Sequence, residues 1–415
     1  MSTSYARVLE SDQAFRLASI EQMLTPVLLI YLDTVDSNIG ATITLAGNDP
    51  NRLRPHIKTA KLHRVIRRCV ELGIHQCKCA TTLEFEVACA AGMRDVLVAY
   101  PMIGANARRI QELSAGHQGT TLSVLVDHRQ QIPQWNASAG IFLDVNPGMD
   151  RTGISTEKVD EALELVHAIA DSGHTFRGLH YYDGHLGSLG FEERRLVATR
   201  GYEQLVQMAA AIEGAGTKVG EVITSGSSVC MFACTYAPLA RAQFVHRVSP
   251  GAALYCDLNI MQQIPEEYGY RPAAVVATRV VSHPRADLLT CDAGLKAVAG
   301  FAGLPNCAVL GRPDLAPQRM SEEHLTLQAP AGSALPELGS ILYLVPRHAG
   351  LTVNNFDEAL VVTSDGMIAV EPVSARGHEP PTAHNPRICD SLDTRLPESL
   401  ETPQDQKKVS TRSTT

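Results

Sequence analysis

Two lysines and a histidine stand close together in the segment Arg54–Lys61, which reads Arg-Pro-His-Ile-Lys-Thr-Ala-Lys. Pro55 stiffens the backbone of this segment, and we predict a short strand over residues 54–60. A lysine at the end of a strand is partly removed from water, which lowers the pKa of its ammonium group and leaves a neutral amine that can attack a carbonyl carbon. We therefore take Lys58 as the candidate nucleophile, and we expect Lys61 to begin the next helix in contact with water.

Two later loops are rich in glycine and small hydroxyl residues. They read Thr224-Ser225-Gly226-Ser227-Ser228 and Ser249-Pro250-Gly251-Ala252. Such loops offer backbone N–H groups and hydroxyl groups to a phosphate, although most loops of this composition are ordinary turns. Charged and aromatic residues follow two further predicted strands, at 144–153 and 180–185. A lysine that faces a phosphate-binding loop is the arrangement that pyridoxal phosphate requires.

A regular alternation of strands and helices must position these residues. Strands are predicted at residues 54–60, 75–80, 95–100, 121–127, 140–146, 176–182, 219–225 and 244–249. Helical periodicity lies between most of them, and only the connection after 121–127 is poor in it. Alternating units imply parallel strands, and eight units fit a closed (β/α)8 barrel, whose functional residues stand at the C-terminal ends of the strands. An open doubly wound sheet is the alternative, but no Gly-x-Gly-x-x-Gly motif follows an early strand.

The helices of this α/β scheme follow from apolar residues at intervals of three and four. We expect them over about 36–47, from Leu62 to Gly73, from Val159 to Ile169, and over 191–214. Ser155 precedes the third of these helices and is its predicted N-cap.

After about residue 270 the helical periods give way to short apolar runs, such as 275–280 and 340–345. Asp365-Gly366 separates two further runs and predicts a β-hairpin. We therefore divide the chain into four regions. These are 1–35, a lead-in whose strand at 26–33 joins the β domain; 36–269, the barrel; 270–375, a mostly antiparallel β domain; and 376–415, a disordered tail rich in Pro, Ser, Thr and charge.

The composition excludes several classes of protein. The 415 residues are 45% hydrophobic, and their net charge of −8 gives no basic surface for nucleic acid. No run of about 18 apolar residues predicts a membrane span, and the first residues lack the pattern of a signal peptide. We expect a cytoplasmic protein whose ten cysteines are mostly reduced core residues. Zinc ligation by Cys77 and Cys79 is the alternative.

The segment around Lys58 resembles the cofactor-lysine motif of the D-threonine aldolase and D-serine dehydratase family, and the resemblance covers about residues 25–372. It includes Ala80-Thr81-x-x-Glu84, Gly148-Met149-Asp150-Arg151-Thr152-Gly153, Pro250-Gly251, Asp292-Ala293-Gly294-Leu295-Lys296, Ser321-Glu322-Glu323-His324, and Pro346-Arg347-His348 through Thr352-Val353-Asn354. The resemblance implies an alanine-racemase-type fold: a (β/α)8 TIM-like barrel with a second, mostly antiparallel β domain. It also implies pyridoxal 5'-phosphate as cofactor, a small D-amino acid as substrate, and a homodimer.

The same resemblance implies roles for individual residues. Lys58 would bind the cofactor covalently, and Arg151 and Tyr181 would face its ring. The phosphate group would be bound by Ser225, Gly226, Ser227, Ser228, Gly251 and Ala252. His348, with His185, would act near the β-oxygen of the substrate, and His348 would also be a metal ligand.

The chain departs from the family's pattern at three positions. The family usually has Cys or Asp two residues after the motif histidine, as the second ligand of a divalent metal, and here this residue is Gly350. Asp183 and His185 are alternative second ligands. Ala253 stands where the family commonly has an aromatic residue, and Ala60 stands where it often has histidine. Whether this chain binds a divalent metal is therefore left open by its sequence.

These observations predict a pyridoxal-phosphate-dependent lyase that acts on a 3-hydroxy-D-amino acid. Cleavage of the D-threonine aldolase type, to glycine and an aldehyde, ranks first, because a general base alone can deprotonate the β-hydroxyl group. Dehydration of the D-serine dehydratase (ammonia-lyase) type depends more on a Lewis-acid metal. An amino-acid racemase, with Tyr343 as its candidate base, and a non-catalytic pyridoxal-phosphate-binding protein are further alternatives.

Overall fold

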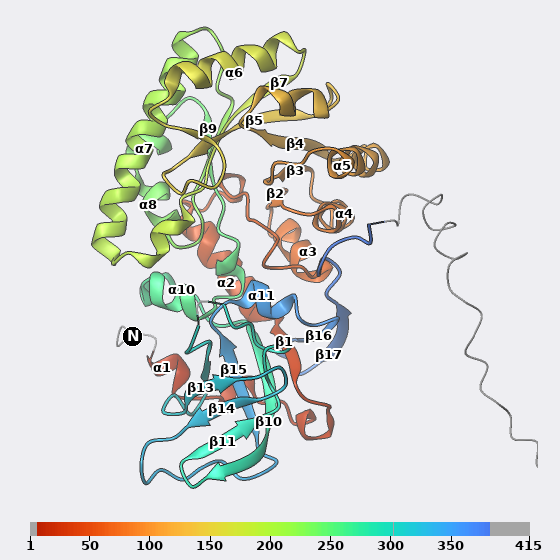
Figure 1. The fold of residues 1–415 in the computed structure, drawn as a ribbon, viewed down its shortest axis with the longest axis vertical. Helices are drawn as coiled ribbons and strands as arrows, with labels where there is room; N and C mark the ends of the chain where they lie inside the picture. The colour runs from red at the N-terminus through yellow and green to blue at the C-terminus, as the bar shows by residue number, and fades with distance from the viewer. Residues whose placement is uncertain (1–5, 302, 382–415) are drawn as a thin grey trace, which may run out of the picture. The chain divides into compact units, whose positions relative to one another are not determined.

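A parallel sheet forms the first half of the computed structural model, which describes residues 6–301 and 303–381. Its strands follow the order β2-β3-β4-β5-β7-β8-β9, and the short β6 pairs with β5 (Figure 1). They are β2 (Gln76–Cys79), β3 (Asp95–Val98), β4 (Thr121–Val126), β5 (Gly140–Asn146), β6 (Ile154–Ser155), β7 (Thr175–Tyr181), β8 (Glu221–Thr224) and β9 (Val245–Val248).

The segment before Lys58 closes this sheet. Leu53 forms a parallel bridge with Val248 in β9, and His56 forms one with Lys78 in β2. The two edge strands are thus joined through one extended segment, which takes the place of the first strand. The predicted (β/α)8 barrel is confirmed, and the open sheet is excluded.

The strand predicted over 54–60 is wrong beyond Ile57. Pro55 has no N–H group, so this segment forms isolated bridges rather than a continuous ladder. From Ile57 the chain turns, and the N–H group of Lys61 donates to the carbonyl of Ile57 at 3.0 Å. Lys61 is buried rather than solvated, because its Nζ donates to Glu84 Oε1 at 3.3 Å and to a backbone carbonyl near the end of the described chain.

Helices cover the outside of the parallel strands (Figure 1). They are α2 (Leu32–Leu45), α3 (His63–Glu71), α4 (Thr82–Ala90), α5 (Ala105–Gly116), α6 (Val159–Asp171), α7 (Phe191–Gly214), α8 (Cys230–Thr235) and α9 (Ala237–Ala240). The short helix α10 (Leu258–Gln263) lies instead at the end of the barrel that faces the second sheet (Figure 1). Between β4 and β5 the chain forms only a 3-10 helix, Arg129–Gln134, as its sequence predicts. Ser155 is not the N-cap of α6, because its pairing in β6 keeps it extended, and the N-cap is Lys158.

A second sheet, mostly antiparallel, follows the order β13-β14-β11-β10-β1-β16-β17, and β15 pairs with β10 and β12. Its strands are β1 (Val27–Tyr31), β10 (Ala274–Arg285), β11 (Leu288–Cys291), β12 (Cys307–Val309), β13 (Ala316–Met320), β14 (Leu325–Gln328), β15 (Ile341–Pro346), β16 (Glu358–Val362) and β17 (Ile368–Pro372). The early strand β1 pairs with β10 and with β16. The hairpin predicted at Asp365-Gly366 connects β16 and β17. Two short helices, α1 (Ala6–Leu9) and α11 (Ala349–Val353), complete the fold.

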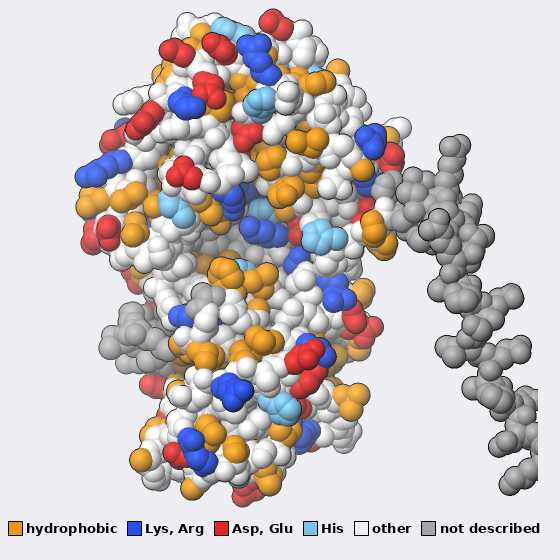
Figure 2. All heavy atoms as spheres, viewed as in Figure 1, with side chains coloured by type: hydrophobic (Ala, Val, Ile, Leu, Met, Phe, Trp, Pro, Cys, Tyr) orange, Lys and Arg blue, Asp and Glu red, His pale blue; other side chains and the backbone are white. Residues whose placement is uncertain are grey.

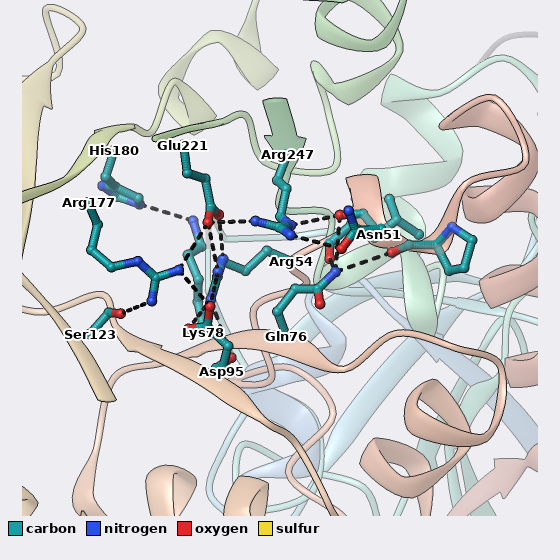
Figure 3. A network of polar contacts seen from close by, with 12 residues as sticks. Asn51, Arg54, Gln76, Lys78, Asp95, Ser123, Arg177, His180, Glu221 and Arg247 are labelled. Atoms are coloured by element: carbon teal, nitrogen blue, oxygen red, sulfur yellow. Dashed lines mark hydrogen bonds and ion pairs between the residues drawn. The ribbon is translucent and has the colours of Figure 1, made fainter. Parts of the chain in front are cut away.

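Arg54 is the centre of a polar network inside the barrel (Figure 3). Its guanidinium group donates to both carboxylate oxygens of Asp95 in β3, at 3.0 and 2.8 Å, and to both of Glu221 in β8, at 2.9 and 3.0 Å. Arg177 and Arg247 pair with the same carboxylates. Because Arg54 is fully buried, these bonds replace the water that its charge would otherwise require.

All nine cysteines in the described part of the chain are free and buried, in agreement with the prediction of reduced core residues. No group of three or more His, Cys, Asp or Glu side chains in residues 6–301 and 303–381 is arranged to hold a metal. Zinc ligation by Cys77 and Cys79 therefore finds no further ligands. No helix of this part is long and apolar enough to cross a membrane. The predicted tail lies, from residue 382 onward, outside the described residues.

Candidate active site

Lys58 projects into two adjoining cavities at the C-terminal end of the barrel. The loop cavity, of about 290 Å³, contains the glycine-rich loops and His348 on its walls. The barrel cavity, of about 170 Å³, is lined by Lys78, Arg151 and other residues of the barrel interior. Lys58, His56 and Tyr182 line both cavities. Figure 2 shows Lys, Arg and His side chains gathered around a hollow in the middle of the face that it presents.

The side chain of Lys58 is exposed, because it extends into the open space of these cavities. Burial lowers its pKa, and the nearby charge of Arg151 lowers it further. The ammonium also lies 5.6 Å from the centre of the Tyr182 ring. The Lys58 N–H group donates to His56 Nδ1 at 3.3 Å, which fixes the turn that aims the lysine. Lys58 is therefore an accessible amine with a depressed pKa, as a nucleophile requires.

The two predicted phosphate loops lie together on the wall of the loop cavity. The residues that they contribute are Gly226, Ser227, Ser228, Ser249, Gly251 and Ala252. Ser249 Oγ is buried and has no hydrogen-bond partner in the protein. A Cβ atom at Gly251 would lie 2.3 Å from the carbonyl oxygen of His56, so only glycine permits this close approach. The loops thus offer an unpaired hydroxyl group and backbone N–H groups to an anion.

Ser225 differs from the other predicted loop residues. It is fully buried, and its backbone has φ +67°. Its hydroxyl group lies 3.0 Å from the hydroxyl of Tyr202 in α7, and Ser225 does not line the cavity. The assignment of Ser225 to the phosphate site is therefore corrected, because its side chain points into the protein beneath the loop.

The predicted role of Tyr181 also needs correction. Its hydroxyl group packs against Gly201 in α7, and its ring contacts that of Tyr202. Successive side chains of a strand point to opposite faces, so the next residue, Tyr182, points to the interior. Arg151 lies 5.2 Å from the centre of the Tyr182 ring. Tyr182 is therefore the aromatic residue beside Lys58 and Arg151.

His348 reaches the loop cavity from the antiparallel half of the chain. It is the N-cap of α11, and its Nδ1 accepts the N–H group of Leu351 at 3.2 Å. Burial lowers its pKa, and the charge of Lys58 lowers it further. His348 is thus a neutral imidazole that carries its proton on Nε2. His185, its predicted companion, lines neither cavity and is only half-buried.

The residues around His348 do not fit a divalent metal. A Cβ atom at Gly350 would lie 3.3 Å from His348 Cε1 and 3.4 Å from Thr59 Oγ1, so a side chain there would point at the histidine. Glycine offers no ligand in that direction. Within the described residues, no group of three possible ligands includes His348, Asp183 or His185.

Two groups at the site did not emerge from the sequence as functional residues. Lys78, in β2, lines the barrel cavity together with His180. Asp257 lines the loop cavity, and burial raises the pKa of its carboxyl group to about 7. Asp257 accepts the N–H group of Ala349 at 2.8 Å, which places α11 and therefore His348. A lysine between the two cysteines of a predicted strand was the available signal for Lys78.

Comparison with family models divides the chain as the two sheets do. Residues 30–259 match the family described as "Alanine racemase, N-terminal domain", which is more than half of the chain. Residues 273–362 match the family described as "Putative serine dehydratase domain".

Named relatives align with most of this chain and with nearly all of their own length. A D-threonine aldolase from Arthrobacter sp. is 26% identical over 373 residues, which are 85% of this chain and 93% of the relative. A 3-hydroxy-D-aspartate aldolase from Paracoccus denitrificans is 28% identical over 375 residues, or 86% and 93%. Among solved structures, that of D-threonine aldolase from Filomicrobium marinum superposes with a TM-score of 0.78 and 27% identity, and the match covers 86% of this chain and 97% of that one.

Proposed function

Since this chain belongs to the alanine racemase N-terminal domain family, we propose that it is a pyridoxal-phosphate-dependent lyase of 3-hydroxy-D-amino acids, of the D-threonine aldolase type. One observation carries the proposal. Lys58, an amine with a depressed pKa, shares a cavity with two glycine-rich loops that follow it by about 170 and 190 residues in the sequence. The names of the aligned relatives, two aldolases of hydroxylated D-amino acids, supply the reaction.

The residues present fit pyridoxal phosphate. Lys58 would hold it covalently, the loops from Gly226 to Ser228 and at Gly251 and Ala252 would hold the phosphate, and Tyr182 and Arg151 would flank the ring. When bound, this cofactor supplies an electron sink for negative charge at Cα. The amine of Lys58, with its lowered pKa, would take and return a proton there.

His348 acts on the substrate oxygen in this proposal. Its Nε2–H group is the free donor, because Nδ1 is occupied by the N–H group of Leu351. A donor at this place would hold the β-oxygen by a hydrogen bond and stabilise the charge that develops on it. Cleavage also needs an acceptor for the proton of the β-hydroxyl group, and the carboxyl group of Asp257, which lines the same cavity, would take that role. The same hydrogen bond from His348 would assist the departure of a hydroxyl group without transfer of the proton. Dehydration is therefore the second candidate function, and this hydrogen-bond arrangement is the observation that favours it.

The racemase alternative has less support within this chain. Tyr343 lies in β15 and is buried. Its hydroxyl group accepts the N–H group of Leu17 at 3.3 Å, so it is engaged away from the cavity.

A product assay tests the proposal. Purified protein loaded with pyridoxal phosphate is given D-threonine and, separately, D-serine. We expect glycine and acetaldehyde from D-threonine, whereas pyruvate and ammonia from D-serine alone would establish the second candidate. Lys58→Ala should lose the visible absorption of the covalently bound cofactor, its fixation by borohydride, and both activities. Lys218→Ala, which removes an exposed lysine, is the control. A borohydride-stable cofactor in Lys58→Ala would contradict the assignment of Lys58.

A further inference from the structure

A second lysine, Lys78, stands inside the barrel beside Lys58. Only 2% of Lys78 is exposed, but its side chain reaches the wall of the barrel cavity. Its Nζ lies 5.5 Å from the centre of the Tyr182 ring, while that of Lys58 lies 5.6 Å from the same centre. Both amines therefore border the space around one aromatic ring. The proposed reaction gives Lys78 no role.

A chain of hydrogen bonds holds Lys78 in place. Its Nζ lies 3.1 Å from His180 Nε2 (Figure 3), and His180 Nδ1 lies 2.7 Å from Asp144 Oδ1. Thr152 donates to the other oxygen of Asp144 at 2.7 Å. The carboxylate of Asp144 can only accept hydrogen bonds, so His180 carries its proton on Nδ1 and donates it to Asp144. Its Nε2 atom then accepts a hydrogen bond from Lys78. Lys78 thus donates one hydrogen bond to His180, while its side chain also lines the barrel cavity.

The barrel cavity has an excess of positive charge. Lys58, Lys78 and Arg151 line it together with two histidines, and no Asp or Glu of the described residues is on its wall. Asp144 stands behind His180 and does not reach this wall. A buried ammonium without a carboxylate partner is costly to maintain. The cavity is therefore built to receive an anion.

We propose that Lys78 binds the carboxylate of the amino acid that enters the site, and that His180 and Asp144 are the positioning residues that aim its ammonium group. The identity of this anion rests on the proposed function, in which the incoming amino group takes the place of Lys58 at the cofactor. The carboxylate is then one carbon atom away from the nitrogen that occupies this place. Lys58 borders both cavities, and the barrel cavity is the one that has Lys78 and Arg151 on its wall and no residue of the phosphate loops.

The charge of Lys78 makes this binding depend on pH. The pKa of Lys78 is lowered to about 7, mainly by burial. The charges of Lys58 and Arg54 contribute to this shift, and those of Asp144 and Asp183 oppose it. The histidines that face it, His180 and His56, are themselves held neutral by burial. A bound carboxylate favours the ammonium form, so binding takes up a proton above about pH 7. The carboxylate contribution to affinity should weaken as the pH rises.

Two amines that differ only in a carboxylate isolate this contribution. D-Alanine and ethylamine both lack a β-hydroxyl group, so neither can be cleaved or dehydrated. Each is titrated into the holoprotein, and its binding is followed by the change in visible absorption when it replaces Lys58. The ratio of the two dissociation constants measures what the carboxylate adds. We expect the wild-type protein to favour D-alanine by about 10- to 100-fold near pH 7, the range for hydrogen bonds to charged groups.

Lys78→Met should reduce this preference to about threefold or less, while the affinity for ethylamine stays within a factor of about 3. Lys218→Met, which removes an exposed charge, should keep the wild-type ratio.

The wild-type protein provides a test without any substitution. From about pH 7 to about pH 8.5 its preference for D-alanine should fall about tenfold per pH unit, whereas both free amines stay protonated. An unchanged ratio in Lys78→Met, or a wild-type ratio independent of pH, overturns the proposal.

Failure of this inference and failure of the proposed function give different results. A protein that shows the predicted ratios but cleaves or dehydrates no hydroxy amino acid keeps Lys78 as the carboxylate site and loses the lyase assignment. A protein that cleaves D-threonine with a ratio unaffected by Lys78→Met keeps the lyase assignment alone. If Arg151→Met abolishes the preference while Lys78→Met does not, the carboxylate belongs to Arg151. A chain that takes up no cofactor overturns both proposals.

Discussion

Single hydrogen bonds fix the proton positions at this site. The backbone N–H group of Leu351 occupies Nδ1 of His348, so the imidazole faces the cavity with Nε2–H. The carboxylate of Asp144 does the reverse for His180, whose Nε2 is left to accept from Lys78. Two neutral histidines in one site therefore have opposite roles, the first as a donor and the second as an acceptor.

Gly350→Cys is expected to create a metal site. The new Cβ atom would lie 3.3 Å from His348 Cε1, which points the thiol toward the histidine, and Cys and His side chains are both zinc ligands. Bound zinc, measured by mass spectrometry after dialysis, should rise in this variant relative to the wild-type protein. Gly350→Ser introduces a side chain similar in size to that of cysteine, but its hydroxyl group is a poor zinc ligand. This variant should not bind the metal. Equal zinc in all three proteins would contradict the geometry inferred at position 350.

At the scale of elements, strand alternation decides which residues enter the site. In β7, His180 points to the interior, Tyr181 to α7, and Tyr182, which follows the strand, again to the interior. The same alternation brings Lys78 of β2 opposite His180, although the two are 102 residues apart. The Arg54 network ties β3 and β8 together inside the same barrel.

Arg54→Met should destabilise the barrel strongly. It leaves Asp95 and Glu221 without their central cation, and removal of one partner from a buried ion pair costs about 3–5 kcal/mol. The free energy of unfolding, measured with urea, should fall by about this amount at neutral pH. Arg312→Met is the control, because Arg312 pairs with Asp314 at the surface, where such pairs contribute about 0–1 kcal/mol.

The effect of Arg54→Met should shrink in acid. Burial opposes the charge of Asp95, but Arg54 and Arg177 outweigh burial and hold its pKa well below the usual value. A carboxyl group whose folded pKa is depressed contributes stability above its unfolded pKa, near pH 4, and loses it as the pH falls. The difference between the two proteins should therefore be largest at neutral pH. A difference that grows toward low pH would contradict the assigned role of the pair.

At the scale of the whole molecule, the site is assembled from both sheets. Lys58 and the phosphate loops come from the barrel, whereas His348 and Phe301 come from the antiparallel half. The segment 295–301 lies beside α11, because the N–H group of Ala299 donates to Thr352. Leu295, Phe301 and Leu351 are each between 41 and 56% exposed near this edge of the cavity. Such a group of exposed apolar side chains is typical of a surface that another chain covers.

We expect a homodimer in solution. Light scattering coupled to size exclusion should give about twice the chain mass of 44.8 kDa. Phe301→Asp places a charge among these apolar residues and should shift the protein toward the monomer. Leu338→Asp alters an equally exposed leucine elsewhere and should leave the mass unchanged. A monomeric wild-type protein, or a Phe301→Asp protein that stays dimeric, would show that this surface is not the interface.

The sequence by itself determined the alternation of strands and helices, the candidate lysine, the phosphate loops and the hairpin at Asp365-Gly366. These depend on periodicity and on turn residues, which are local properties of the chain. The tertiary structure alone decided that Tyr182 rather than Tyr181 borders the site, that Lys61 is buried against Glu84, and that Lys78 meets His180. The physical reason is that strand register and chain packing bring together residues far apart in sequence, and no local pattern records which side chains then face one another.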